Sequence, residues 1–287
     1  MNRLAQLLTV ASVLTIPFAF PATAQTSKEP AGSAAAAGEP GAEDLAKKLS
    51  NPISDLVSVP FQANWDQGVG VDDGTRFILN IQPVVPMSLN KKWNLIARVI
   101  MPLIGQPPLV DGAASTFGMG DILASAFFSP ADSSKVIWGV GPVVSLPTTT
   151  DPYLGSGKWS GGPTFVILKQ KGPWTYGVLW NQIWSFADAI DADRPEVSQM
   201  FVQPFLAHTN KRAVTYQLSS ESTANWKADD GDQWTVPIIA MASKVSSFGP
   251  FIASYGVGVG GYVVSPEGGP DWKLRAMFTL LLPKKHP

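Results

Sequence analysis

The chain has 287 residues, of which 45% are hydrophobic and only 15% charged, against about 25% charged residues in a typical soluble protein. It contains 26 Gly, 25 Pro and 10 Trp, which points to many turns and many amphipathic aromatic anchors. A formal net charge of -1 and two histidines argue against nucleic-acid binding and leave little material for histidine-based catalysis or metal ligation. Because the chain has no cysteine, we exclude thiol nucleophiles, disulfides, cysteine-ligated metal sites and an N-terminal lipid-bearing cysteine.

Residues 1–24 have the pattern of a secretory signal peptide. Arg3 supplies the positive charge, residues 4–20 form an apolar core, and residues 22–24 have the small side chains of a cleavage site. A spanning helix would need about 20 unbroken apolar residues, whereas Pro17 and Pro21 interrupt this run. No later apolar run is long enough for a membrane helix, so any membrane role must be played by strands.

Residues 25–53 are predicted to be a flexible periplasmic linker with a short helical segment. Residues 25–41 carry no large apolar side chain and cannot offset the entropy of ordering their backbone. Residues 43–49 can form a short amphipathic helix through Leu45, Ala46 and Leu49. Asn51-Pro52 would stop it, because the residue before proline is disfavoured in the helical region.

From Ser54 to the C-terminus the hydrophobic period is 2, which is typical of β-strands. Leu95 and Val99, for example, alternate with Asn94 and Arg98. Most segments are about as long as the 9 to 11 residues of a tilted transmembrane strand. Twelve segments follow this pattern: 54–66, 76–86, 93–102, 118–129, 135–147, 162–171, 174–185, 199–207, 213–225, 233–244, 248–264 and 272–283.

The connections between these segments alternate between short and long. Short or tight turns such as 172–173 and 245–247 alternate with longer connections rich in Gly, Asp and Pro, such as 103–117 and 148–161. Short periplasmic turns and longer external loops are typical of an outer-membrane barrel with an even number of antiparallel strands. We therefore predict an all-β fold, a closed antiparallel transmembrane barrel of about twelve strands over residues 54–287.

Tryptophans at the predicted strand ends agree with this interpretation. Indole prefers the membrane interface, because its ring is apolar and its N–H needs a polar partner. The alternative is a soluble β-sandwich with Trp in its core, which would normally carry more surface charge. The interface positions are Trp65, Trp184, Trp226, Trp234 and Trp272 at the predicted external ends, and Trp93 and Trp174 at the periplasmic ends.

Several sequence blocks resemble a family of Gram-negative outer-membrane β-barrels. The blocks are 45–56 running into 59–66, 79–86, 118–122, 138–142, 146–148, 203–205, 221–226 and 269–275. This family is described as transporters linked to the meta pathway of phenol degradation, and some members carry the label neuromedin U. The resemblance covers nearly the whole chain after the signal peptide. It implies passive movement of small molecules, including aromatic or hydrophobic compounds, and no catalytic residue.

If the aliphatic and aromatic face of each strand meets lipid, the opposite face lines the lumen. Four charged candidates admit two interpretations: a ladder that selects an anionic or polar solute, or ion pairs that satisfy one another because a buried charge must find a partner. The balanced charge count favours pairing. The lumen and selectivity candidates are Arg98, Asp121, Glu221, Arg275, Asn80, Gln82, Asn181 and Gln217.

Acidic residues in two predicted external loops could hold Ca²⁺ or Mg²⁺, but their spacing does not match a known calcium loop, so solvated acidic loops are favoured. We therefore predict no metal and no cofactor. The acidic positions are Asp188, Asp191, Asp193 and Glu196 in one loop, and Asp229, Asp230 and Asp232 in the other.

The favoured function is an outer-membrane channel or transporter for small molecules, exported by its signal peptide. Its expected partners are outer-membrane lipid and lipopolysaccharide, the barrel assembly machinery and an unidentified small solute, with no nucleic acid. One alternative is a structural or adhesive barrel without transport. Another is a membrane-embedded lipid-modifying enzyme, which would need a nucleophile activated by a base. Only His208 is available within the barrel, at a predicted turn, so we expect no enzymatic activity.

Overall fold

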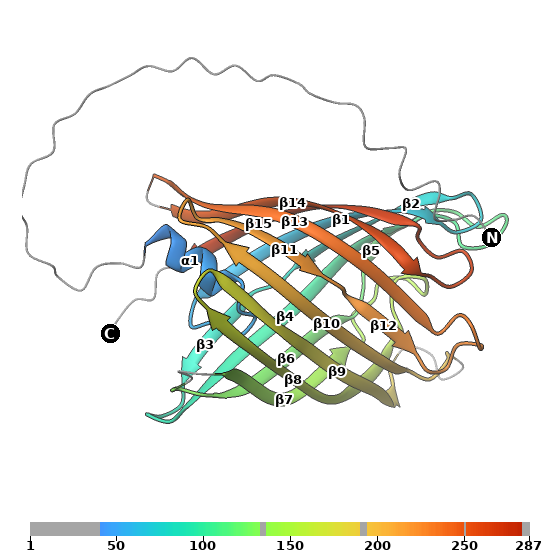
Figure 1. The fold of residues 1–287 in the computed structure, drawn as a ribbon. Coiled ribbons are helices and arrows are strands. Elements are labelled where there is room, and N and C mark those ends of the chain that lie inside the picture. Colours follow the sequence, from blue (N-terminus) through green and yellow to red (C-terminus); the bar gives the residue numbers. More distant parts are fainter. Residues whose placement is uncertain (1–40, 133–135, 190–193, 250, 283–287) are drawn as a thin grey trace, which may run out of the picture. The chain divides into compact units, whose positions relative to one another are not determined.

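The computed structural model describes residues 41–132, 136–189, 194–249 and 251–282. The predicted signal peptide, 1–24, and residues 25–40 lie outside this part. The described residues form one helix and a single antiparallel sheet that closes into a barrel (Figure 1). Within them, no helix combines the length and the apolar character needed to cross a membrane.

The sheet has fifteen strand segments. They are β1 (Val57–Val69), β2 (Gly74–Ile81), β3 (Val84–Ser88), β4 (Trp93–Gln106), β5 (Thr116–Met119), β6 (Ile122–Pro130), β7 (Ile137–Leu146), β8 (Lys158–Lys171), β9 (Trp174–Asp188), β10 (Ser198–Thr209), β11 (Val214–Ser219), β12 (Ser222–Asn225), β13 (Trp234–Phe248), β14 (Phe251–Val264) and β15 (Trp272–Leu282). Each segment pairs with the next in sequence except where two consecutive segments form one strand, and β15 returns to pair with β1.

Three of the barrel strands are each divided into two segments, so the fifteen segments make twelve strands. The pairs are β2 with β3, β5 with β6, and β11 with β12. Both halves of the first pair bond to the same neighbours, β1 and β4. Its interruption contains Pro83, which has no N–H to donate to the ladder. The sequence prediction of twelve antiparallel strands is confirmed, but the interruptions were not predicted.

The alternation predicted for the strand faces is present. In β4 the inward positions include Ile96, which is buried, and Arg98, which lines the lumen, while Leu95 and Val99 occupy the alternate outward positions. The outer surface carries exposed apolar side chains on nearly every strand, and exposed tryptophans lie near both ends. Trp93 and Trp174 lie at one end, and Trp65, Trp184 and Trp272 at the other.

The two ends of the barrel differ in their connections. One, which we call the short-turn end, carries the turns 89–92, 172–173 and 210–213 as well as both termini of the described barrel. The opposite, long-loop end carries the longer connections, including 107–115 and 147–157. The first connection at the long-loop end is shorter than predicted, covering only 70–73, because β1 and β2 both extend beyond their predicted limits.

Helix α1 (Ala42–Leu49) lies against the short-turn end of the barrel (Figure 1). Its Leu45 and Ala46 are buried against Ala213, Val245 and Leu281 of the barrel wall. The Gln170 amide of β8 donates to the Lys47 carbonyl oxygen over 3.0 Å, which ties the C-terminal turn of the helix to the barrel wall. The segment predicted as linker therefore packs onto the barrel through Leu45, Ala46 and Ile53.

The chain after α1 continues into the barrel interior. Ile53 is only 5% exposed and belongs to an inward apolar cluster contributed by several strands. The cluster consists of Ile53, Val84, Ile96, Phe127, Val166, Leu168, Leu179 and Phe205. Burying a side chain of this size stabilises the folded state by about 1.5–3 kcal/mol. Ile53 therefore holds the N-terminal segment inside the short-turn end of the barrel.

Val99→Arg should destabilise the barrel by about 2–4 kcal/mol, because it places a charge on the outward face near mid-strand. Asn94→Arg, on the inward face of the same strand, should cost much less. The measurement is urea unfolding of the refolded protein in lipid vesicles, followed by the heat-dependent gel shift of a folded barrel. Equal losses in the two variants would contradict the assignment of the faces.

Candidate functional site

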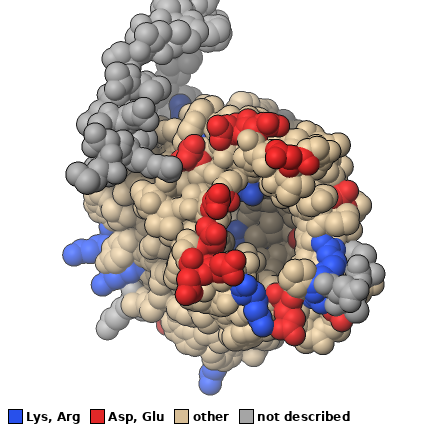
Figure 2. Space-filling view, turned by 90° about the vertical axis from the view of Figure 1, so that its right-hand side faces the viewer, with Lys and Arg blue, Asp and Glu red and all other residues tan. Residues whose placement is uncertain are grey.

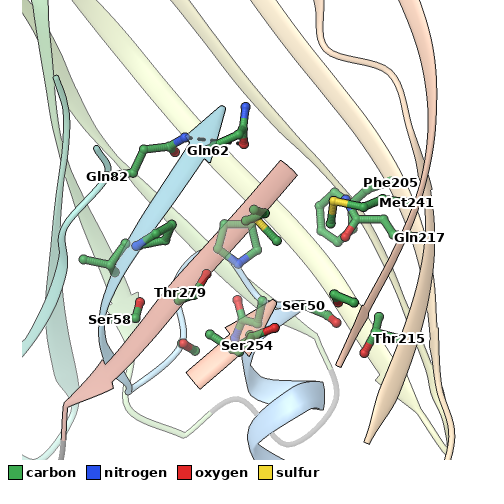
Figure 3. A pocket seen from close by; sticks show the side chains of 18 of the residues that line it. Ser50, Ser58, Gln62, Gln82, Phe205, Thr215, Gln217, Met241, Ser254 and Thr279 are labelled. Atoms are coloured by element: carbon green, nitrogen blue, oxygen red, sulfur yellow. Dashed lines mark hydrogen bonds between the residues drawn. The ribbon is translucent and has the colours of Figure 1, made fainter. Parts of the chain in front are cut away.

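The interior of the barrel contains two cavities that share one lining residue, Arg98. The inner cavity, of about 170 Å³, lies beside α1, and Ser, Thr and Gln side chains form much of its lining (Figure 3). The outer cavity, of about 370 Å³, lies toward the long-loop end. Figure 2 shows an opening at that end, with acidic side chains on much of its rim and basic side chains visible inside.

The centre of the site is an ion pair that crosses the lumen between non-adjacent strands. Arg275 of β15 donates through both terminal nitrogens to Glu221, at 2.7 and 2.6 Å. The two side chains are only 5% and 20% exposed. Arg275 also donates through Nε to the Asn64 side chain of β1 over 2.8 Å. This bidentate geometry is the strong form of a charge-assisted hydrogen bond, and it fixes both side chains across the lumen.

Glu221 reaches the lumen from the interruption between β11 and β12. The neighbouring strand β14 leaves room for these side chains. Gly258 of β14 is the register partner of Arg275, and Gly260 is the register partner of Lys273. A Cβ atom on Gly260 would lie 3.3 Å from the Lys273 Cγ atom. Glycine at these inward positions therefore allows two long basic side chains to lie along the wall.

Arg98 lies at the junction of the two cavities. Its Nη2 atom donates to the Gln82 side-chain oxygen over 2.7 Å, and Gln82 in turn donates to Gln62 over 3.5 Å. Among the described residues, no carboxylate forms an ion pair with Arg98. We call Gln82, Arg98, Glu221 and Arg275 the lumen charge cluster; it holds two cations and one anion.

A second charged cluster, which sequence reasoning missed, lies nearer the long-loop end. Asp66 is 1% exposed and accepts hydrogen bonds from Arg76 at 3.0 Å and from the Tyr262 hydroxyl at 2.9 Å. Lys273 lies 3.1 Å from the same carboxylate. Asp66 is the register partner of both Arg76 and Lys273. The register of a closed β1–β15 pair could have identified this cluster, because cross-strand partners of opposite charge attract.

Asp121 has a different role from the other charged candidates. It lines the outer cavity, but its carboxylate accepts hydrogen bonds from the Ser156 amide at 2.6 Å, the Ser156 hydroxyl at 2.7 Å and the Gly157 amide at 3.1 Å. It also accepts from the Thr149 amide at 3.2 Å. No arginine pairs with it in the described part of the chain. Asp121 thus holds the 147–157 connection, whose buried Leu154 and partly buried Ser156 line the outer cavity.

The uncharged candidates are divided between the cavities. Gln82 and Gln217 line the inner cavity, and Asn181 lines the outer one. Asn80 is paired in register with Gln62 on the inward face but lines neither cavity.

The acidic loop residues do not assemble into a metal site among the described residues. Asp188 pairs with Lys158, and Glu196 accepts a hydrogen bond from Lys227 over 2.8 Å. That hydrogen bond and the charge of Lys227 hold the pKa of the exposed Glu196 carboxyl below its usual value. Asp191 and Asp193 lie outside the described residues.

Solved structures with this fold include two outer-membrane proteins. An outer-membrane channel from Pseudomonas putida F1 superimposes with a TM-score of 0.62 at 14% identity, over 79% of this chain and 94% of the channel. The porin NanC superimposes with a TM-score of 0.51 at 7% identity, over 78% of this chain and 99% of the porin. No protein-family model and no curated protein matches the sequence. At these identities the similarity establishes the fold, that of an outer-membrane β-barrel.

Glu221→Gln should lower the free energy of unfolding by about 3–5 kcal/mol, because it leaves the buried Arg275 without its carboxylate. Glu196→Gln is the matched control, since it removes a glutamate from an exposed ion pair at the rim and should change stability little. Thermal unfolding followed by gel mobility measures both. If neither variant loses stability, or if both lose the same amount, the ion pair between Glu221 and Arg275 does not stabilise the barrel as proposed.

Proposed function

We propose that the protein is an outer-membrane channel that passively moves small molecules across the membrane through its lumen. One observation supports this most directly: two cavities, each lined by both polar and apolar side chains, share Arg98 inside a closed barrel whose long-loop end is open (Figure 2). Side chains on the wall, rather than the barrel radius, would then limit the size of the solute.

The proposed orientation places the short-turn end and both termini in the periplasm and the long loops outside, as in other outer-membrane barrels. The apolar outer surface and its two sets of tryptophans support insertion in lipid. Export by the signal peptide, assembly by the barrel machinery and contact with lipopolysaccharide belong to the same proposal. The link to phenol degradation, and with it an aromatic solute, rests on the sequence resemblance alone.

The enzymatic alternative has less support in the geometry. His208 lies in β10, one residue before its end, rather than in the turn where sequence reasoning placed it. Its ring lies 4.7 Å from the Trp174 ring in an edge-on arrangement, and it lines neither lumen cavity. A structural or adhesive barrel is distinguished from a channel by conductance.

Removal of the N-terminal segment tests the proposed path directly. A refolded chain that begins at Asp55 should conduct more ions in a planar bilayer than one that begins at Gly41, because α1 and Ile53 fill the short-turn mouth. The chain beginning at Gly41 also serves as the control for loss of residues 1–40. Equal conductance would show that the segment does not restrict the path, and no conductance from either chain would contradict the channel.

The lumen charge cluster should make the channel prefer anions, since it holds two cations and one anion in a narrow passage that focuses the field. Arg98→Gln should shift the reversal potential in a KCl gradient toward cation preference. Arg212→Gln removes the same charge from an exposed short turn and should leave the potential unchanged. An unchanged potential in Arg98→Gln would mean that Arg98 does not influence the ion path.

A further inference from the structure

Arg98 is a cation with no direct carboxylate partner among the described residues, although Glu221 lies near enough to act on it electrostatically. Gln82 fixes its orientation through a single hydrogen bond, although a guanidinium has five N–H donors. The side chain contributes to the lining of both cavities. A cation inside a protein is stabilised by an anion that accepts its remaining hydrogen bonds.

The two carboxylates that line these cavities, one in each, have other partners. Glu221 gives both carboxylate oxygens to Arg275, and Gln203 lies 3.4 Å from one of them. Asp121 gives both oxygens to the amides and the hydroxyl of the 147–157 connection. Neither carboxylate accepts a hydrogen bond from Arg98 in the structure, so its remaining N–H groups are available to an anionic solute.

The outer cavity shows what kind of solute would fit beside Arg98. Next to the guanidinium, one part of the wall is apolar and formed by Ile100, Leu123, Phe127, Leu179, Ile183 and Phe201. Hydroxyl and amide groups, including Ser125, Thr164 and Asn181, complete the lining. The volume of about 370 Å³ is at the lower end of the range for small-molecule sites, about 300–1,000 Å³.

We infer that the outer cavity is a binding site for a small monocarboxylate with a hydrophobic body, whose carboxylate pairs with Arg98 and whose body contacts the apolar wall. A planar guanidinium matches a carboxylate in a bidentate arrangement. A strongly hydrated dianion such as phosphate would gain nothing from the apolar wall and would lose more hydration. This inference rests on the proposed function, because it assigns the solute class of the same lumen.

The test uses the full-length refolded protein in detergent and 4-fluorobenzoate observed by fluorine NMR. Wild-type protein should broaden the ligand signal in a saturable way, while 4-fluorobenzyl alcohol, of similar shape but neutral, should bind at least about tenfold more weakly. Arg98→Gln should weaken 4-fluorobenzoate binding by about tenfold or more, with Arg212→Gln as the unchanged control. Partition into micelles is the same for all three proteins.

Leu123→Asn provides a variant that keeps Arg98 and makes the apolar wall polar. It should weaken 4-fluorobenzoate several-fold, so the inference remains testable if Arg98→Gln does not fold. Equal binding of the carboxylate and the alcohol to wild-type protein would overturn the inference. Displacement of 4-fluorobenzoate by equimolar inorganic phosphate would also overturn it, since the site would then recognise charge alone.

Conductance in KCl without added ligand separates this inference from the proposed function. Saturable 4-fluorobenzoate binding in a protein that does not conduct would support the site and overturn the channel. Conductance without such binding would overturn the site and leave the channel.

Discussion

Closure of the sheet between β1 and β15 is the constraint on which the rest of the structure depends. The first and last strands pair from Val57 with Leu282 to Gln67 with Trp272, so neither leaves an unpaired edge. A strand edge without water or a partner would leave backbone groups unsatisfied. Because side chains alternate along each strand, closure also decides which residues face inward. The same pairing places Asn64 opposite Arg275 and Asp66 opposite Lys273, and thereby assembles both charged clusters.

The sequence was sufficient for the fold because the barrel follows from a local pattern. The alternation of Leu95 and Val99 with Asn94 and Arg98 determines two faces without knowledge of any distant contact, and the alternation of short and long connections determines antiparallel order. The inward positions of Arg98, Glu221 and Arg275 follow in the same way. Their ion-pair partners cannot be predicted from the pattern. Arg275 and Glu221 lie on strands that are not neighbours, and only the curvature of the closed barrel brings them together.

The hydrophobic alternation could not predict features that depend on loops or on competition for hydrogen bonds. Asp121 has the spacing of a lumen residue, yet the amides of the 147–157 connection occupy its carboxylate. Residues 41–53 were predicted to be a linker with a short helix, and the helix is present as α1, but the pattern did not predict that Leu45 and Ile53 are buried on or inside the barrel. In both cases the contacts of the side chain depend on a distant segment of the chain, and the pattern of a single strand or helix does not show which segment that is.

In the proposed channel, the lumen would place two different constraints on a solute, one after the other. At the short-turn end, α1 and Ile53 occupy space, and this steric barrier acts on every solute regardless of its charge. At the junction of the cavities Arg98 acts electrostatically, favouring an anion and leaving a neutral molecule nearly unaffected. A solute held too tightly at Arg98 would block the path rather than cross it, because conduction requires binding that is weak enough to release. The charge of Glu221 acts on Arg98 electrostatically and would weaken its hold on an anion in the proposed channel.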